Sequence, residues 1–310
     1  NTANRTGGGL WASHANVSVA NSGTMQAQTT HFTANRAQLG GGIYLQDAQL
    51  SAQAGLGRIL VTENTAGAGG GVYCEAAMGA SCLIQGVNVQ SNTAASGGGV
   101  YVQGHVCQGA GTPAAAAGSE ASLFVNVIIA NCTADQQGGG VFVSCSRTEL
   151  HGTVISSCST RHTEQDSNMG GGMFVKESRV TGAGLVVERC TSRQGGCVAV
   201  EDSSVVARKA SLGGDLHLQS CHAGLGGGAL IVLPPRQHVL IHPSLLRGLR
   251  ITAATASVGA GIGIAQGAHV ALHECTIADC VAIVGGGIHA AAESVVDASH
   301  TVVQNCSARS

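Results

Sequence analysis

A glycine triplet recurs along the whole of this sequence and constrains its fold more than any other feature. Gly-Gly-Gly or a close variant begins at residues 7, 40, 69, 97, 138, 170, 195, 226, 259 and 285, the seventh copy being Gly-Gly-Cys and the ninth Gly-Ala-Gly. The first and last copies begin 278 residues apart, so the mean period is about 31 residues. A fixed period of this length is the signature of a repeat architecture, in which one supersecondary unit stacks on the next.

A second motif recurs with the same period and consists of an apolar residue, two variable residues and then Asn or Cys. Its last positions are Asn35, Asn64, Asn92, Cys132, Cys158, Cys190, Cys221, Cys280 and Cys306, and only the copy Ile251-Thr-Ala-Ala254 lacks the polar or thiol end. We call these positions the Asn/Cys column. We expect the column to point inward, because stacked asparagines can hydrogen-bond along an axis and Cys can replace them as a small buried residue.

The repeat is predicted to be a loop of short strands rather than a pair of helices. A helical repeat needs two apolar stripes of ten or more residues, and no copy contains them. The 47 glycines fit tight corners, and 3% aromatic residues are too few for a core of large side chains. A mean hydropathy of +0.22 is too apolar for disorder. The sequence therefore predicts an all-β fold, with each repeat forming one coil of a parallel β-helix.

The two motifs together resemble the repeat of the polymorphic outer-membrane proteins, a family of bacterial surface adhesins that carries Gly-Gly-Ala-Ile and Phe-x-x-Asn motifs. The match is Phe32-Thr-Ala-Asn35 followed by Gly40-Gly-Gly-Ile43, and nine looser copies cover nearly the whole chain. The resemblance implies a right-handed, pectin-lyase-like parallel β-helix, here of about ten coils. Gly at the third place and Cys at many Asn positions depart from the family pattern and, with the glycosylation sequons, suggest a eukaryotic relative.

The organisation expected is one β-helix domain over residues 1–310, as a fragment of a longer protein, because the chain begins and ends within the repeat pattern. Three stretches break the period and are interpreted as insertions: 104–122, 159–169 and 234–244. A net charge of −2 gives no argument for nucleic acid as a partner. No run of about 18 apolar residues occurs, so no membrane span is expected in this segment.

The twelve cysteines include no Cys-x-x-Cys pair, which argues against zinc ribbons and thioredoxin-like sites. We expect no metal and no cofactor. Cys74 and Cys82 are the first choice for a disulfide because a short Ala/Gly-rich segment separates them, and Cys107 and Cys145 are the second. The thiols of the Asn/Cys column could pair between coils, but we expect them to be free and buried.

Four N-glycosylation sequons begin at Asn4, Asn16, Asn131 and Asn305. Asn131 and Asn305 precede the Asn/Cys column, so strand alternation turns them outward, whereas Asn4 aligns with the column itself. Glycans are therefore expected at Asn131, Asn305 and Asn16. Together with the cysteines, the sequons favour an extracellular or cell-surface location.

Six of the eight aromatic residues occupy one position, four residues after the first glycine of a triplet. This ring column consists of Trp11, Tyr44, Tyr73, Tyr101, Phe142 and Phe174. Aliphatic residues flank each ring, and strand side chains alternate between faces, so we expect the rings on the outside as one stacked, exposed stripe. Such a stripe either stabilises the sheet or binds a protein or glycan at the cell surface.

Catalysis on this type of fold needs clustered carboxylates on one face. Only Glu177 and the pair Glu201–Asp202 fall on adjacent coils, and a solvated turn after a strand is the favoured explanation for them. The function that the sequence favours is a non-catalytic, structural and adhesive segment, a rigid spacer whose aromatic stripe contacts a protein, a glycan or a second copy of the chain. Two alternatives remain: a polysaccharide lyase, hydrolase or epimerase, and an architectural filament subunit.

Overall fold

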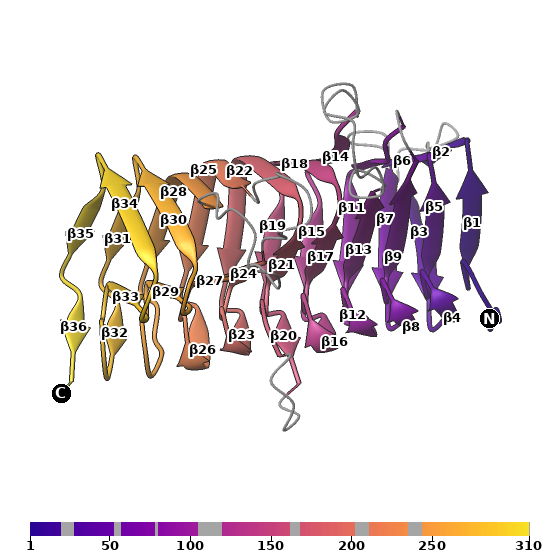
Figure 1. Ribbon diagram of the computed structural model, residues 1–310. Helices are drawn as coiled ribbons and strands as arrows, with labels where there is room; N and C mark the ends of the chain where they lie inside the picture. Colours follow the sequence, from indigo (N-terminus) through magenta and orange to yellow (C-terminus); the bar gives the residue numbers. More distant parts are fainter. Residues whose placement is uncertain are drawn as a thin grey trace.

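The computed structural model describes residues 1–19, 28–52, 57–77, 80–104, 120–161, 168–201, 211–234 and 244–309. Within these residues the regular structure consists of β-strands, and no helix occurs. The strands follow one another in sequence order along the molecule, and the two ends of the chain lie at opposite ends of the row (Figure 1). The all-β expectation is confirmed.

The strands that follow the glycine triplets form one parallel sheet along the length of the molecule, which we call the ring sheet. Its described strands in spatial order are β1 (Leu10–Ser13), β5 (Ile43–Gln46), β9 (Val72–Ala76), β13 (Val100–Gly104), β17 (Val141–Ser144), β21 (Met173–Lys176), β24 (Val198–Glu201), β27 (Leu230–Leu233), β29 (Ile262–Ile264) and β33 (Ile288–Ala290). Neighbours in this sheet are one repeat apart in the sequence.

A second parallel sheet, the long sheet, contains the strands that lead into the Asn/Cys column and those before them. Its described strands are β2 (Asn16–Val19), β3 (Gln28–Thr33), β6 (Gln49–Ala52), β7 (Gly57–Thr62), β10 (Leu83–Gln85), β11 (Val87–Gln90), β14 (Ser122–Val125), β15 (Ile128–Ala130), β18 (Arg147–His151), β19 (Val154–Ser156), β22 (Arg179–Glu188), β25 (Ser211–Gln219), β28 (Ser244–Thr252), β30 (His269–His273), β31 (Thr276–Ala278), β34 (Val295–Ser299) and β35 (Val302–Gln304). Strands β22, β25 and β28 each run through both halves of this sheet. β22 pairs with the two shorter strands β18 and β19, β28 pairs with β30 and β31, and β25 lies between the two long strands.

A third, short sheet lies between the Asn/Cys column and the glycine triplets. Its described strands are β4 (Arg36–Leu39), β8 (Thr65–Ala68), β12 (Thr93–Ser96), β16 (Thr133–Gln137), β20 (Ser159–Thr160), β23 (Thr191–Gln194) and β26 (His222–Gly226), and the pair β32 (Val281–Ala282) and β36 (Ser307–Ala308) follows. Isolated bridges through Thr255 connect β26 to β32. The short sheet therefore continues past β26 as single bridges.

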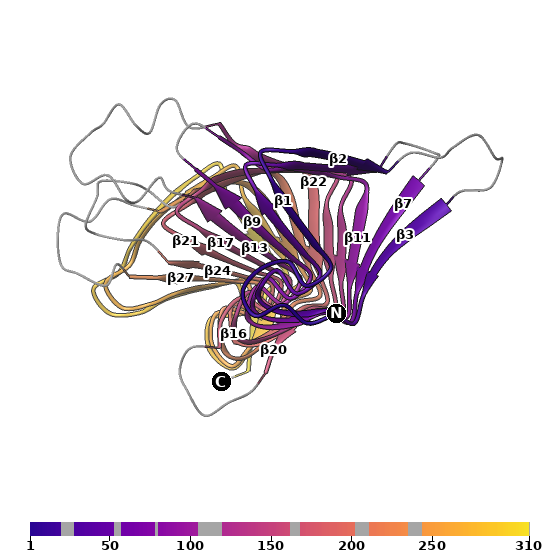
Figure 2. The same cartoon turned by 90° about the vertical axis from the view of Figure 1, so that its right-hand side faces the viewer.

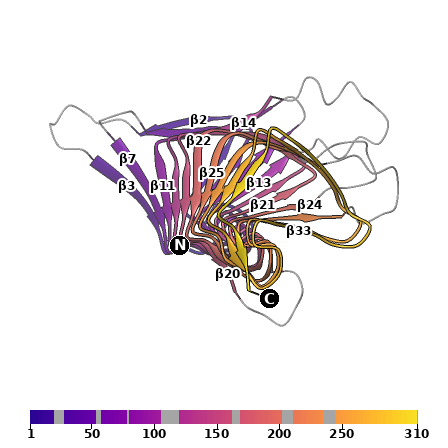
Figure 3. The same cartoon turned by 90° about the vertical axis from the view of Figure 1, so that its left-hand side faces the viewer.

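Each repeat visits the three sheets in the same order and then returns to the first. The chain passes from β7 in the long sheet to β8 in the short sheet, to β9 in the ring sheet and back to β10 in the long sheet. Views along the row of strands from either end show the three groups fanning out around a common centre (Figures 2 and 3). All the sheets are parallel, an arrangement compatible with a parallel β-helix.

The first glycine of each triplet turns the chain into the ring sheet with a left-handed backbone. Gly69 has φ +62°, and a Cβ atom there would lie 3.0 Å from Cα of Tyr73. In the eighth repeat the left-handed residue is Gly227, with φ +64°, so the triplet is Gly227-Gly228-Ala229 and begins one residue later than the sequence suggested. Ile231 therefore takes the ring-column position of this repeat, in register with Ala199.

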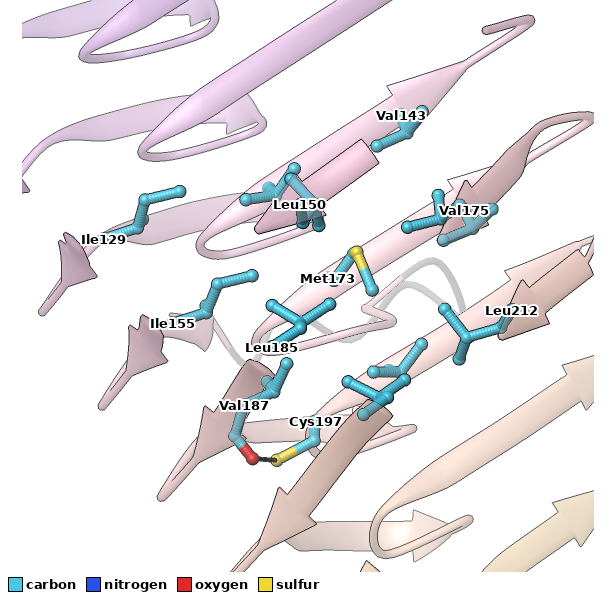
Figure 4. Close-up of a cluster of buried hydrophobic side chains, with 14 of the residues drawn as sticks. Ile129, Val143, Leu150, Ile155, Met173, Val175, Leu185, Val187, Cys197 and Leu212 are labelled. Atoms are coloured by element: carbon cyan, nitrogen blue, oxygen red, sulfur yellow. Dashed lines mark hydrogen bonds between the residues drawn. The ribbon is translucent and has the colours of Figure 1, made fainter. Parts of the chain in front are cut away.

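The core is a set of aliphatic ladders that run along the axis. Ile129, Ile155 and Val187 lie in register on successive strands of the long sheet, and all three are completely buried (Figure 4). Val143 and Val175 form the facing ladder from the ring sheet. Burying an aliphatic side chain of this size contributes about 1.5–3 kcal/mol. The repeated ladders thus fix the same register in every coil.

Candidate functional site

The ring column forms one continuous stack over five repeats of the ring sheet. Ring centroids are 5.4 Å apart between Tyr44 and Tyr73, 5.1 Å between Tyr73 and Tyr101, 4.6 Å between Tyr101 and Phe142 and 5.2 Å between Phe142 and Phe174. Neighbouring ring planes differ by 4° to 18°. The parallel register places each ring opposite the next. The aliphatic neighbours Val72 and Cys74 belong to the central core, so the rings occupy the opposite face of the sheet, as alternation predicts.

The structure differs from the expected exposed stripe, because most of these rings are buried. Tyr44, Tyr73, Phe142 and Phe174 are 8% exposed or less, and Tyr101 is half-buried. Only Trp11, on the edge strand β1, is open, with 55% of its surface exposed. At this position a side chain can therefore point away from the central core and still be shielded from solvent.

Two features account for the burial. Each ring inside the stack is covered on both flat faces by the rings of the preceding and following repeats. At its C-terminal end the stack enters a separate apolar cluster, where Phe142 and Phe174 pack with Ala199 and Ile231 and with the partly buried Met169 from the turn before β21. Ile231 is the member of this cluster that the sequence analysis missed, and the Ala after Gly227-Gly228 was the signal that could have found it.

Polar groups line the edge of the ring stack at the end of the strands. The hydroxyl of Tyr44 donates a hydrogen bond to the carboxylate of Glu75, and the hydroxyl of Tyr101 lies 3.4 Å from Oε1 of Gln103, to which it donates. Burial, followed by the contact with Glu75, raises the pKa of Tyr44, and burial also raises the pKa of Tyr73 and Tyr101. The three phenols are therefore held in their neutral form.

The asparagines of the Asn/Cys column point inward, as expected. Asn35, Asn64 and Asn92 are between 1% and 4% exposed. Nδ2 of Asn64 donates to the carbonyl oxygen of Phe32 in the preceding repeat at 2.8 Å, and Nδ2 of Asn92 donates to that of Val61 at 2.9 Å. The residue before each column position has a left-handed backbone, with φ of +57° at Glu63. This turn directs the amide into the molecule.

Cysteine replaces asparagine in this column as a small buried donor. Its nearest acceptor is the carbonyl oxygen two residues earlier, 3.3 Å from Sγ in both Cys132 and Cys158, and the carbonyl that asparagine uses lies farther away. Sγ of Cys132 lies 3.8 Å from the carbonyl oxygen of Val89, and Sγ of Cys158 lies 3.8 Å from that of Ile129. Cys132, Cys158 and Cys190 are buried and free. Burial raises the pKa of Cys158 and Cys280, the latter to about 12. Cys158 and Cys280 are therefore held in the protonated form, and the burial of the column thiols gives them a structural character.

Two disulfides lie within the described residues. Cys74 is bonded to Cys82, the first choice from the sequence, with Cα atoms 6.3 Å apart. Cys197 is bonded to Cys221 of the Asn/Cys column, with Cα atoms 5.4 Å apart. The sequence analysis missed this second bond.

The missed bond follows from the third place of the triplet, which faces the column residue of the next repeat. A Cβ atom on Gly172 would lie 3.1 Å from Sγ of Cys190, and one on Gly71 would lie 3.0 Å from Nδ2 of Asn92. Cys at the third place therefore meets Cys in the column. Cys145 is also disulfide-bonded, and its expected partner Cys107 lies outside the described residues.

The carboxylate candidates occupy different environments. Glu177 sits in a left-handed turn with φ +49°, as the turn interpretation predicts, and the Sγ atom of Cys145 lies 3.7 Å from its Oε2 atom. Glu201 on β24 is 5% exposed, and its carbonyl oxygen accepts a hydrogen bond from the backbone N of Glu177 at 3.1 Å. Asp202 lies outside the described residues. Among the described residues no three or more His, Cys, Asp or Glu side chains form a group suited to a metal ion.

Asn131, Asn305 and Asn16 are exposed, which glycosylation requires. Asn4 is exposed as well. Its expected alignment with the inward column does not hold, because Thr2 pairs with Arg36 and therefore Asn1, not Asn4, lies opposite Asn35. Asn131 and Asn305 occupy the left-handed turn before the Asn/Cys column, with φ of +54° and +52°. Most of each insertion, at 104–122, 159–169 and 234–244, lies outside the described residues.

No protein-family model, no curated protein and no solved structure matches this chain. In the described part of the chain there is no helix of the length and apolar character needed to cross a membrane. The functional argument therefore depends on the geometry of the chain itself.

Proposed function

We propose that this chain is one right-handed parallel β-helix of about ten coils, of the polymorphic outer-membrane protein type, that serves as a rigid, non-catalytic spacer and adhesive surface of an extracellular or cell-surface protein. The observation that carries the proposal is the unbroken register of the ring sheet, in which each strand from β1 to β33 pairs in parallel with the strand one repeat away. Ten strands at about 4.8 Å would give a rod of roughly 48 Å.

The interior of the molecule supports a spacer role. Ring stacking, the asparagine hydrogen bonds and the Cys197–Cys221 bond all connect one coil to the next, so they oppose bending along the axis. The buried rings Tyr44, Tyr73, Phe142 and Phe174 contribute to this stiffness. Trp11, which is exposed, is the ring of the column that is open to a partner protein or glycan.

The disulfides and the exposed sequons are compatible with an extracellular location. Cys74–Cys82 and Cys197–Cys221 are stable only where the environment is oxidising. Asn131, Asn305 and Asn16 offer accessible acceptor sites for glycans. Glycopeptide mapping of the chain secreted from eukaryotic cells tests this part of the proposal.

The alternative of a polysaccharide lyase, hydrolase or epimerase has less support. On the outer face of the ring sheet, the register aligns Glu75 with Gln103, Ser144, Lys176 and Glu201 in that order. Two carboxylates in this row are four strands apart, too far to share one glycosidic bond. Glu177 and Glu201 remain the candidates for such an enzyme.

One set of experiments separates the three functions. Small-angle scattering should give the dimensions of a monomeric rod. The labelled chain should bind measurably to cell surfaces. Acidic polysaccharides incubated with the chain should show no new chain ends from cleavage of glycosidic bonds. Cleavage that is lost in Glu201→Gln would replace the proposal by the enzyme. Concentration-dependent fibres without cell binding would replace it by the filament subunit.

A further inference from the structure

A hollow of about 200 Å³ lies on the long sheet, where β22, β25 and β28 run side by side. Arg179 and Thr181 from β22, Gly213 from β25, and Leu245 and Arg247 from β28 line it. It lies on a different sheet from the ring column and belongs to none of the sites described above. Its lining joins three successive repeats.

The hollow exists because one side chain is missing from an outward-facing row. The register aligns Glu149, Thr181, Gly213, Arg247 and His273 on successive strands. Every member of this row except Gly213 has a side chain that stands on the surface. The preceding residue, Leu212, is buried, so residue 213 faces outward. Glycine at this position therefore leaves a gap between Thr181 and Arg247.

The rim of the gap is positively charged. Arg179 is exposed and has neither an ion pair nor a side-chain hydrogen bond within the described residues. Nε of Arg247 donates to Oε2 of Glu274 at 3.2 Å, and that bond leaves both terminal nitrogens of the guanidinium unused. The two arginines are two strands apart, about 10 Å along the axis, which two long side chains can span over one small anion.

The remaining walls suit a compact group with an apolar face. Leu245 is 41% exposed and stands beside Gly213 in the gap. Thr181 adds one hydroxyl that can donate to or accept from a ligand. Guanidinium groups bind carboxylate and sulfate oxygens with paired, charge-assisted hydrogen bonds. The combination suits an anion attached to a small ring.

We propose that this hollow binds one carboxylate- or sulfate-bearing sugar residue of an acidic glycan. Its anionic group lies between Arg179 and Arg247, its C–H face packs on Leu245, and a ring hydroxyl bonds to Thr181. The inference does not depend on the adhesive role proposed above, because a spacer that fails to bind cells would still present this hollow.

Calorimetric titration with three defined probes tests the proposal: trigalacturonate, a heparin-derived tetrasaccharide and maltotriose. At least one of the two charged probes should bind and the neutral one should not. Binding of trigalacturonate, which carries only carboxylates, identifies carboxylate as a sufficient ligand group, whereas binding of the heparin tetrasaccharide alone identifies sulfate. Arg179→Gln and Arg247→Gln should each weaken binding about tenfold or more, as expected for a lost charge-assisted bond. Arg58→Gln is the matched control, because Arg58 is exposed on β7 of the same sheet.

Filling the gap tests recognition by shape separately from charge. A Cβ atom on Gly213 would lie 3.7 Å from the carbonyl oxygen of Arg247, an ordinary contact, and its φ is not left-handed. Gly213→Val should therefore fold as well as the parent chain and lose the charged probe. Three results would overturn the proposal: no binding of either charged probe, an equal loss in Arg58→Gln and Arg179→Gln, or unchanged affinity in a folded Gly213→Val chain.

Discussion

Oδ1 of Asn64 accepts two hydrogen bonds from Asn35, one from its backbone N at 2.8 Å and one from its Nδ2 at 2.9 Å. The same pair of bonds recurs one repeat later, where Asn64 donates to Oδ1 of Asn92 at 2.9 and 3.0 Å. Each amide therefore satisfies a backbone N–H at a buried corner and continues the chain of side-chain bonds. Successive coils are therefore joined at this corner by side-chain as well as backbone hydrogen bonds.

Asn64→Ala should lower the free energy of unfolding by about 1–3 kcal/mol, because the buried backbone N–H of Asn35 loses its acceptor. Asn64→Cys should cost less, since sulfur can act as a weak acceptor at this position: Nδ2 of Asn92 lies 4.0 Å from Sγ of Cys132 in the next repeat. Urea unfolding followed by circular dichroism measures both. Asn88→Ala on β11, which removes an amide without a side-chain hydrogen bond in the described structure, should change little. Equal losses at Asn64 and Asn88 would contradict the role of the column.

Cys197→Gly should destabilise the chain by about 2–4 kcal/mol relative to the oxidised parent, a typical value for removal of a native disulfide. The substitution recreates the Gly-Gly-Gly triplet of other repeats but leaves the thiol of Cys221 unpaired. The double variant Cys197→Gly, Cys221→Asn should recover part of the loss, because it restores the Gly–Asn pairing seen at Gly71 and Asn92. Denaturation with and without reductant checks the prediction. A parent chain insensitive to reductant would count against it.

Stability should fall as the pH rises above about 9. Burial raises the pKa of Cys280 from 9.0 in the unfolded chain to about 12 in the folded chain. Between these pH values the thiol loses its proton only when the chain unfolds, so rising pH favours the unfolded state. Tyr44 and Tyr73 act in the same direction above pH 10.0, since burial raises the pKa of both. The chain has only three tyrosines, all in the ring column, so tyrosinate absorbance reports this column alone. The midpoint of the tyrosinate absorbance change should lie above pH 10.0 in the folded chain and near pH 10.0 in denaturant. A normal titration in the folded chain would contradict the burial of the phenols.

The periodic features of the fold could be predicted because they depend on one repeat at a time. The triplet and the Asn/Cys motif locate the corners of every coil, and alternation correctly assigns Val72 inward and Tyr73 to the opposite face. The stacking of the rings follows from placing the same residue type at the same position in successive coils.

The remaining features depend on contacts between different positions of neighbouring coils. Alternation gives the face of a side chain but not what packs over that face, so it cannot distinguish the buried Tyr73 from the exposed Trp11. The Cys197–Cys221 bond requires the third place of one triplet to be aligned with the column of the next repeat. The hollow at Gly213 likewise becomes visible only when β22, β25 and β28 are placed in register.

Tyr73→Ala should destabilise the chain by about 3–5 kcal/mol, the usual cost of truncating a large buried ring. The ring is 8% exposed and stacks on Tyr44 on one side and on Tyr101 on the other, so its removal opens a cavity and breaks two ring contacts. Tyr73→Phe should retain nearly all the stability, because the stack needs the ring and the Tyr73 hydroxyl makes no hydrogen bond to any residue that the structure describes. Trp11→Ala, at the exposed end of the column, should change stability by about 0.5 kcal/mol or less. Urea unfolding of the three variants ranks them. Equal costs of Trp11→Ala and Tyr73→Ala, or no measurable cost of either, would contradict the conclusion that the buried rings stabilise the fold.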